Sequence, residues 1–301
     1  MNRLAVAVLV LIWGTTWAAI RIGLEGTPPF TGVALRFALA GAVLLAMVPL
    51  FRVRLGQSRR EVALWALNGL LSFSLSYGIV YWAEQRISSG LAAVLFATFP
   101  LFVAAFSHFW LPGERLTARS LSGTLIGFAG VAVIFSEDLS RLAEPVGEVG
   151  ALGGGIAAAA GLFLVSPLVS AFANVATKRW GKGLHPLSIT AVPMLLTGAV
   201  MGTLAALVEG DREMIWDVSS VGAILYLAIF GSAVTFSVYF WLLGRMPATR
   251  LSLITYAVPV VAVVTGTLFL EETLTVRVGI GAALVILGVA LAVWKKEDER
   301  S

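Results

Sequence analysis

Ten long apolar runs constrain this chain more than any other feature. A helix that crosses the hydrocarbon core of a bilayer needs about 20 apolar residues. The runs are apolar on every face, unlike the short alternating strands of a membrane barrel. In lipid, a helix satisfies every backbone group within its own segment. We therefore predict an all-α integral membrane protein with ten transmembrane helices, at 4–24, 30–51, 62–84, 88–110, 119–136, 149–176, 187–208, 218–243, 248–270 and 274–294.

Composition excludes several classes of function. Hydrophobic residues make up 58% of the chain and charged residues only 13%, whereas soluble domains carry about 25% charged residues. The chain has no cysteine and two histidines, His108 and His185, so we expect no metal and no cofactor. The net charge of +4 resides in short loops between apolar runs. We therefore expect the lipid bilayer as a partner and no nucleic acid.

Two runs need separate interpretation. The run at 4–24 is too long and too uniform for a cleaved signal peptide, and we predict that it is retained as the first helix. The run at 149–176 contains Gly153, Gly154, Gly155 and Pro167, and we expect its helix to be broken or strongly tilted.

The distribution of lysine and arginine predicts the orientation. With the N-terminus in the cytoplasm, fifteen basic residues fall on the inner side and five on the outer side, a strong positive-inside bias. Only Arg36 lies well inside a span. We expect a multi-pass protein of the inner membrane with both termini cytoplasmic.

The chain repeats itself. Residues 87–135 and 246–294 read alike, and they place Pro100 opposite Pro259, Glu114 opposite Glu272 and Gly123 opposite Gly281, with Trp82 opposite Trp241 just upstream. Each repeat spans five helices, an odd number, so the two copies must cross the membrane in opposite directions. We predict two inverted five-helix repeats, at 1–140 and 148–296. Inverted repeats are a hallmark of secondary transporters.

Several motifs resemble the EamA family of the drug/metabolite transporter superfamily, and within it the YedA-like branch. The residues are 12–17 (IWGTTW), 28–29 (PP), 36–37 (RF), 81–85 (YWAEQ), 89–93 (SGLAA) and 113–117 (GERLT). The resemblance covers nearly the whole chain. It implies ten helices, cytoplasmic termini and export of metabolites, amino acids or drugs, without naming a substrate. The sixth helix departs from the pattern, with 169–174 (VSAFAN) where the first helix has 12–17, so we expect an asymmetric site.

Two charged residues are the main candidates for transport chemistry. Arg36 lies roughly 10 Å into the second helix at 1.5 Å per residue, and a charge at a helix centre costs at least about 2.5–3.5 kcal/mol. It is either a substrate-anion anchor or gate, or a side chain that snorkels to the outer interface near Glu25 or Glu84. Glu84 is either a proton-coupling carboxylate or an interfacial acid paired with Arg86.

Other in-span polar and aromatic residues complete the predicted site. The predicted substrate-binding residues are Thr16, Trp17, Arg36, Ser76, Tyr77, Tyr81, Asn174, Tyr239 and Tyr256. The alternatives are interface belts for the aromatic residues and interhelical hydrogen bonds for the hydroxyl and amide residues. Pro100 and Pro259 are predicted hinges, because each proline in a helix frees the carbonyl four residues earlier, on Phe96 and Thr255.

These observations predict a secondary transporter that exports a small metabolite, such as an amino acid or related compound or a drug, by alternating access. The small-molecule substrate is a predicted partner and the proton a candidate second one, while the residues assign no oligomeric state. An intramembrane enzyme is a weaker alternative, because His108 is the only in-span histidine and no nucleophile motif accompanies it. A passive channel is a third hypothesis, and a test for counter-flow would distinguish a channel from a transporter.

Overall fold

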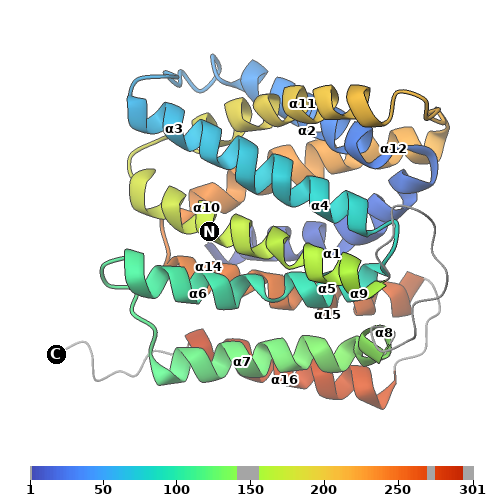
Figure 1. Ribbon diagram of the computed structural model, residues 1–301. Helices are drawn as coiled ribbons and strands as arrows, with labels where there is room; N and C mark the ends of the chain where they lie inside the picture. The colour runs from blue at the N-terminus through green and yellow to red at the C-terminus, as the bar shows by residue number, and fades with distance from the viewer. Residues whose placement is uncertain (1, 141–155, 270–274, 294–301) are drawn as a thin grey trace.

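The computed structural model describes residues 2–140, 156–269 and 275–293, and these residues form helices joined by short turns, without a strand (Figure 1). The first half contains α1 (Asn2–Gly26), α2 (Pro29–Met47), α3 (Arg59–Leu67), η1 (Asn68–Leu75), α4 (Ser76–Ala83), α5 (Ser89–Phe96), α6 (Phe99–Trp110), α7 (Ala118–Ile134) and α8 (Ser136–Ser140). The second half contains α9 (Ile156–Phe163), α10 (Val165–Trp180), α11 (Ser188–Val208), α12 (Val218–Ala228), η3 (Ile229–Val234), α13 (Thr235–Leu243), α14 (Ala248–Ser252), α15 (Ile254–Phe269) and α16 (Val276–Val293).

These helices confirm the predicted membrane architecture. Among the described residues, eight helical segments are long and apolar enough to cross a membrane. Two shorter apolar helices, at Ala118–Ile134 and Ala248–Val261, stand where the fifth and ninth spans were predicted. The chain is therefore an all-α, multi-pass membrane protein of about ten helices.

The helix of the sixth span is interrupted, as predicted, but the span ends at a later residue than predicted. α9 ends at Phe163 and α10 begins at Val165, so the break falls at Leu164, just before Pro167. α10 continues to Trp180, whereas the sequence prediction ended this span at residue 176. Residues 149–155 lie outside the described part of the chain.

The two halves start equivalent helices with equivalent caps. Ser58 accepts a hydrogen bond from the backbone of Glu61 at the start of α3, and Asp217 does the same for Ser220 at the start of α12. Thr117 and Thr275 cap α7 and α16 in the same way. Such caps satisfy backbone N–H groups that have no partner within the helix. The internal repeat thus extends to the residues that decide where helices begin.

Equivalent helices of the two halves pack against each other in antiparallel pairs. On α7 and α16, a Cβ added to Gly123 would come within 2.6 Å of the Gly288 carbonyl oxygen, and one added to Gly130 within 2.7 Å of the Gly281 carbonyl oxygen. Gly123 is equivalent to Gly281, and Gly130 is equivalent to Gly288. Exchanging the two halves therefore turns the contact between Gly123 and Gly288 into the contact between Gly281 and Gly130. The helices therefore cross about a local two-fold axis.

The pair formed by α2 and α11 follows the same rule at the opposite edge of the bundle (Figure 1). Gly41 faces Leu195, and Gly198 faces Ala38. Residues 38 and 195 are 157 positions apart, as are 41 and 198. Small residues allow helix backbones to approach closely in lipid, where apolar packing supplies the attraction.

We predict that Gly288→Ala destabilises the protein. The new methyl group would come within 2.6 Å of the Gly123 carbonyl oxygen and 2.7 Å of the Gly127 Cα, both backbone atoms. Overpacking of this kind costs about 1–3 kcal/mol, which lowers the melting temperature in detergent. The matched control is Gly279→Ala on the same helix, where no atom lies within 4 Å of the new methyl group. Equal melting temperatures for the two variants would contradict the close packing.

Candidate functional site

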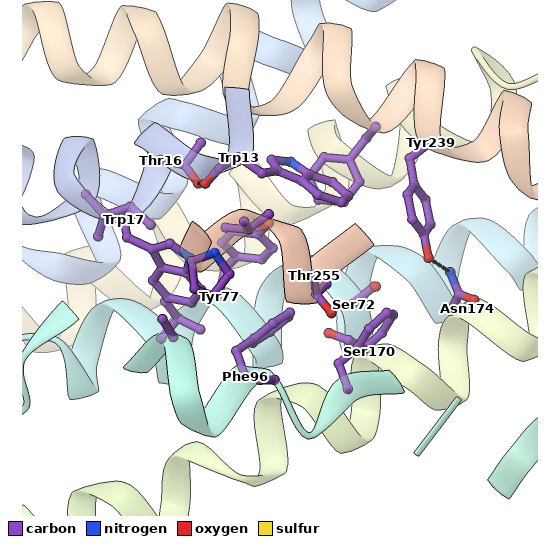
Figure 2. Close-up of a pocket in the computed structure, with 18 of the residues that line it drawn as sticks. Trp13, Thr16, Trp17, Ser72, Tyr77, Phe96, Ser170, Asn174, Tyr239 and Thr255 are labelled. Carbon is purple, nitrogen blue, oxygen red and sulfur yellow. Dashed lines mark hydrogen bonds between the residues drawn. The ribbon is translucent and has the colours of Figure 1, made fainter. Parts of the chain in front are cut away.

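A cavity lies between the two halves of the protein. Its wall is built from α1, α2, η1, α4, α5, α6, α10, α13 and α15, and its empty space, including the opening, amounts to about 970 Å³. Figure 2 shows Trp13, Trp17, Tyr77 and Phe96 around this space. Ligand pockets in proteins are mostly apolar with a few polar groups, and the lining of this cavity has that character.

The wall repeats across the two halves. The lining contains equivalent residues in pairs, at the spacing of the internal repeat: Trp13 with Ser170, Trp17 with Asn174, Tyr77 with Phe236, Val80 with Tyr239, Phe96 with Thr255 and Phe99 with Val258. The cavity therefore lies on the local two-fold axis. Because most pairs join different residue types, its chemistry is not symmetric.

Aromatic rings form much of the wall. Trp13 packs with its ring centroid 5.7 Å from Phe236 and 5.4 Å from Tyr239, and Trp17 lies 5.8 Å from Phe96 in an edge-to-face arrangement. Ring faces attract apolar groups and cations. The walls therefore suit an apolar or positively charged part of a ligand.

Arg36 is the charged residue of the cavity wall. Its side chain is only 1% exposed. Nε donates to the Ser232 hydroxyl at 2.8 Å, Nη2 donates to the Gly231 carbonyl at 3.0 Å, and Nη1 donates to the Tyr81 hydroxyl at 3.3 Å. The guanidinium carbon also lies 4.8 Å from the ring centroid of Tyr77. The interpretation that Arg36 snorkels to an interface is wrong, because the cation is held inside the protein and forms no ion pair with a described carboxylate.

Two π-helical turns place these groups. η1 interrupts the third span and η3 interrupts the eighth, at equivalent positions of the repeat. π turns inside α-helices are frequently found at functional sites. The Arg36 clamp uses η3, and a Cβ at Gly231 would come within 3.1 Å of Thr16 Cγ2 and 3.5 Å of Arg36 Nη2. A glycine at this turn therefore lets α1 and the guanidinium approach the backbone.

Hydrogen-bonded polar groups line the side of the cavity formed by α10. Asn174 Nδ2 donates to the Tyr239 hydroxyl at 2.7 Å, which Figure 2 draws as a dashed line. Asn174 Oδ1 is buried and makes no hydrogen bond within the described part of the chain. Ser170 donates to Ser76 at 2.8 Å, and Ser76 is 2.8 Å from the Ser166 hydroxyl. Ser76 thus supports the wall from behind.

The predicted site residues therefore divide into two groups. Those that line the cavity are Thr16, Trp17, Arg36, Tyr77, Asn174, Tyr239 and Pro259. Ser76, Tyr81, Tyr256, Glu84 and Pro100 do not line it. Tyr81 accepts a hydrogen bond from Arg36, which does line the cavity, so its link to the cavity is indirect. Tyr256 is fully buried against Gly127, and its hydroxyl makes no hydrogen bond to a described residue.

The two predicted hinges differ in structure. Pro259 lies inside α15, as expected. Pro100 is not mid-helix, because α5 ends at Phe96 and α6 begins at Phe99. Pro100 has no N–H to donate to the Phe96 carbonyl, and its ring clashes with that carbonyl. The helix is therefore interrupted at Ala97 and Thr98, and Pro100 lies in the first turn of the next helix, where proline is tolerated.

Glu84 occupies an unusual environment at the end of α4. Its side chain is fully buried, and neither carboxylate oxygen has a hydrogen-bond partner among the described residues. The expected ion pair with Arg86 is absent. Arg86 instead donates to the Trp82 carbonyl at 2.9 Å and lies 4.0 Å above the Trp82 ring. Arg21 donates to the backbone carbonyl of Glu84 at 2.8 Å.

Sequence reasoning missed several lining residues, among them Ser72, Phe96 and Phe236. The internal repeat carried a usable signal, since Phe236 is the equivalent of Tyr77 and Thr255 the equivalent of Phe96. No sequence pattern indicates that Ser232 binds Arg36, because a π turn brings its hydroxyl to the guanidinium. Within the described ranges, no three histidine, aspartate or glutamate side chains gather in a way that would hold a metal ion.

Comparison with protein families gives a specific match. The sequence profile of the EamA-like transporter family matches residues 3–136 and, a second time, residues 157–294. The two matches fall on the two halves of the bundle.

Known relatives span the same length. The chain is 32% identical to the uncharacterized inner membrane transporter YedA of Escherichia coli over 289 residues, which cover 95% of this chain and 89% of YedA. It is 27% identical to the uncharacterized transporter YoaV of Bacillus subtilis, with 95% and 94% of the two chains covered. A solved crystal structure of a protein 22% identical to it superposes with a TM-score of 0.78 over 97% of each chain, which supports the fold.

We predict that Arg36 and Ser232 are energetically coupled. A hydrogen bond to a charged group contributes about 1.5–3 kcal/mol, although bonds between membrane helices average nearer 0.6. A double-mutant cycle with Arg36→Met and Ser232→Ala, read from unfolding in detergent, should give a coupling energy of roughly 1 kcal/mol, within the range of contacting residues. The control is Ser237→Ala, since the Ser237 hydroxyl makes no hydrogen bond in the described structure. Additive effects of Arg36→Met and Ser232→Ala would refute the clamp.

Proposed function

Because the chain belongs to the EamA-like transporter family of the drug/metabolite transporter superfamily, we propose that this membrane transporter exports small metabolites across the inner membrane by alternating access. The observation that carries the proposal is a central cavity on the local two-fold axis, with a buried arginine in its wall. Two inverted halves can rock about such a site, and the two resulting states use similar packing.

The cavity favours a substrate that carries a carboxylate and an apolar part, such as an amino acid or a related metabolite. A guanidinium has five N–H donors, and three of those on Arg36 bond to protein groups. The remaining donors suit a carboxylate, which arginine binds in a planar, charge-assisted geometry. The aromatic wall then receives the rest of the molecule, and its ring faces also tolerate an ammonium group.

Glu84 is the proposed coupling group, with the proton as the coupling ion. A buried carboxylate that has no hydrogen-bond partner is costly in its charged form. Protonation or a change of partner during the transport cycle relieves that cost. Glu84 does not line the cavity, so it acts on transport through the end of α4 and not through contact with the substrate.

The orientation follows from the same proposal. We place both termini in the cytoplasm, since this puts most basic loop residues on the inner side. The alternatives are a passive channel and an intramembrane enzyme. His108, the residue on which an enzyme would depend, accepts a hydrogen bond from the backbone of Leu116 at 3.1 Å and is exposed at the end of α6.

We predict saturable counter-flow in proteoliposomes, with amino acids as the first substrates to test. Arg36→Met should abolish uptake of a carboxylate substrate while the protein still inserts, because the anion anchor is lost. Glu84→Gln should retain exchange at equilibrium and lose uptake driven by a pH gradient. The control is Arg245→Ala, since Arg245 is exposed and its side chain bonds to the Trp241 carbonyl and lies over the Trp241 ring, away from the cavity lining. Linear flux without counter-flow would favour the channel and overturn the transporter mechanism.

We also predict that residues 115 and 277 lie on opposite faces of the membrane. Residue 115 lies just before α7 and residue 277 in the first turn of α16, which are equivalent helices of the two halves, so an inverted repeat must separate them. Single cysteines at these positions in a chain that has none of its own can be labelled with an impermeant maleimide in intact cells. A cysteine at position 182 should follow position 115. Labelling of 115 and 277 from the same face would exclude the inverted arrangement.

A further inference from the structure

A cation near the end of the first helix in each half binds the end of the third helix in the same half. In the first half, Arg21 on α1 donates from Nη1 to the backbone carbonyl of Glu84 at 2.8 Å. In the second half, Lys178 on α10 donates from Nζ to the carbonyl of Leu243 at 2.6 Å and to that of Met246 at 3.0 Å. Glu84 directly follows α4, Leu243 is the last residue of α13, and Met246 lies three residues beyond Leu243.

The two contacts are equivalent under the internal repeat. Residues 12–17 correspond to 169–174, a spacing of 157 that makes Arg21 the equivalent of Lys178. Trp82 corresponds to Trp241, a spacing of 159 that makes Glu84 the equivalent of Leu243. Because the halves are inverted, the two contacts lie at opposite ends of the bundle. In Figure 1 the end of α4 lies on the right and the end of α10 on the left.

Each contact lies one helical turn beyond the cavity. Trp17 and Val80 line the cavity, and Arg21 and Glu84 follow them by four residues. At the other end, Asn174 lines the cavity four residues before Lys178, and Phe240 lines it three residues before Leu243. Four residues make about one turn of a helix. The contacts thus tie together helix ends that lie one turn beyond the cavity wall, one contact in each half.

The chemistry of these contacts suits repeated opening. The last carbonyls of a helix lack partners within it and form the negative end of its dipole, so they attract a cation. The bond joins a cation to a neutral group, and water can replace either partner at a helix end. Opening therefore breaks a hydrogen bond to a neutral carbonyl and not a direct ion pair, whose disruption inside a protein is more costly.

We propose that Arg21 with Glu84 and Lys178 with Leu243 and Met246 are paired latches that close opposite ends of the substrate pathway. The inference rests on the proposed alternating access, in which one latch opens while the other holds. Both latches are made in this structure. Lys178 and Arg21 are positioning residues, because they hold helix ends and do not line the cavity.

The two latches differ in their surroundings. Lys178 binds two carbonyls and lies near Glu114, whose carboxylate accepts a hydrogen bond from the backbone of Thr249 at 3.4 Å. Arg21 binds one carbonyl, and the nearby carboxylate of Glu84 has no hydrogen-bond partner among described residues. The Lys178 latch is therefore the more strongly held of the two, and the Arg21 latch the easier to open.

The test uses the absence of native cysteine. Ser72 lines the cavity and is partly accessible, so Ser72→Cys reports on access to it. The reporter is labelled with a membrane-impermeant maleimide in right-side-out and in inside-out vesicles. Arg21→Met should raise the labelling rate several-fold from one face, and Lys178→Met should raise it several-fold from the other face. The conservative variants Arg21→Lys and Lys178→Arg should label close to the parent rate.

The direction of the change separates latches from general loosening. If both methionine variants raise labelling from the same face, or equally from both faces, the contacts are only structural and the proposal fails. Unchanged labelling also overturns it. Arg21→Gln and Lys178→Gln keep a donor without the charge and should give smaller shifts in the same directions, which keeps the test valid if a methionine variant does not assemble. Counter-flow by the parent protein is measured separately. If the two methionine variants raise labelling from opposite faces but the parent shows no counter-flow, the latches are supported and the proposed transporter mechanism is rejected.

Discussion

Lipid offers no hydrogen bond to a peptide group, and both the fold and the cavity depend on this constraint. Facing lipid, the chain must be helical, and irregular backbone is tolerated only where protein or a cavity surrounds it. Three of the irregular places meet that condition, whereas the break at Leu164 is exposed. The break at Ala97 and the π turn at Ser72 both contribute to the cavity wall, and the break at Leu253 lies just before its lining residue Thr255. The constraint that keeps the spans helical therefore favours placing helix breaks and π turns at the cavity.

The predictable part of the structure is the part that this constraint dictates. Apolar runs and the repeated Pro, Glu and Gly positions were enough to predict about ten helices in two inverted sets. They were also enough to single out Arg36, because an unpaired charge in a span is costly. Its partners could not be predicted, since Ser232 and the Gly231 carbonyl meet it through a π turn that no residue pattern announces. Tyr256 was misplaced for a related reason, because a tyrosine at membrane depth looks the same in sequence whether it faces a cavity or Gly127.

A symmetric scaffold here carries an asymmetric site. Packing across the two-fold axis makes Pro193 on α11 the equivalent of Arg36 on α2, as the contacts of Gly41 and Gly198 fix the register. One half therefore supplies the cation, and the other supplies the π turn that holds it. Division of labour of this kind follows when a duplicated gene keeps its packing residues, such as the paired glycines, while its cavity residues diverge.

This combination has a consequence for the energies of the transport cycle. In the proposed alternating access, equivalent helix pairs and the proposed latches give the two end states similar packing, so neither is trapped. A difference between them must then come from residues that break the symmetry, among them Arg36, Glu84 and the unlike pairs of the cavity wall. A ligand shifts a two-state equilibrium only by its differential affinity for the two states. In the proposed mechanism, an anion that draws Arg36 away from the π turn of the opposite half changes the contact between the halves themselves, and this would link substrate binding to the choice of which end opens.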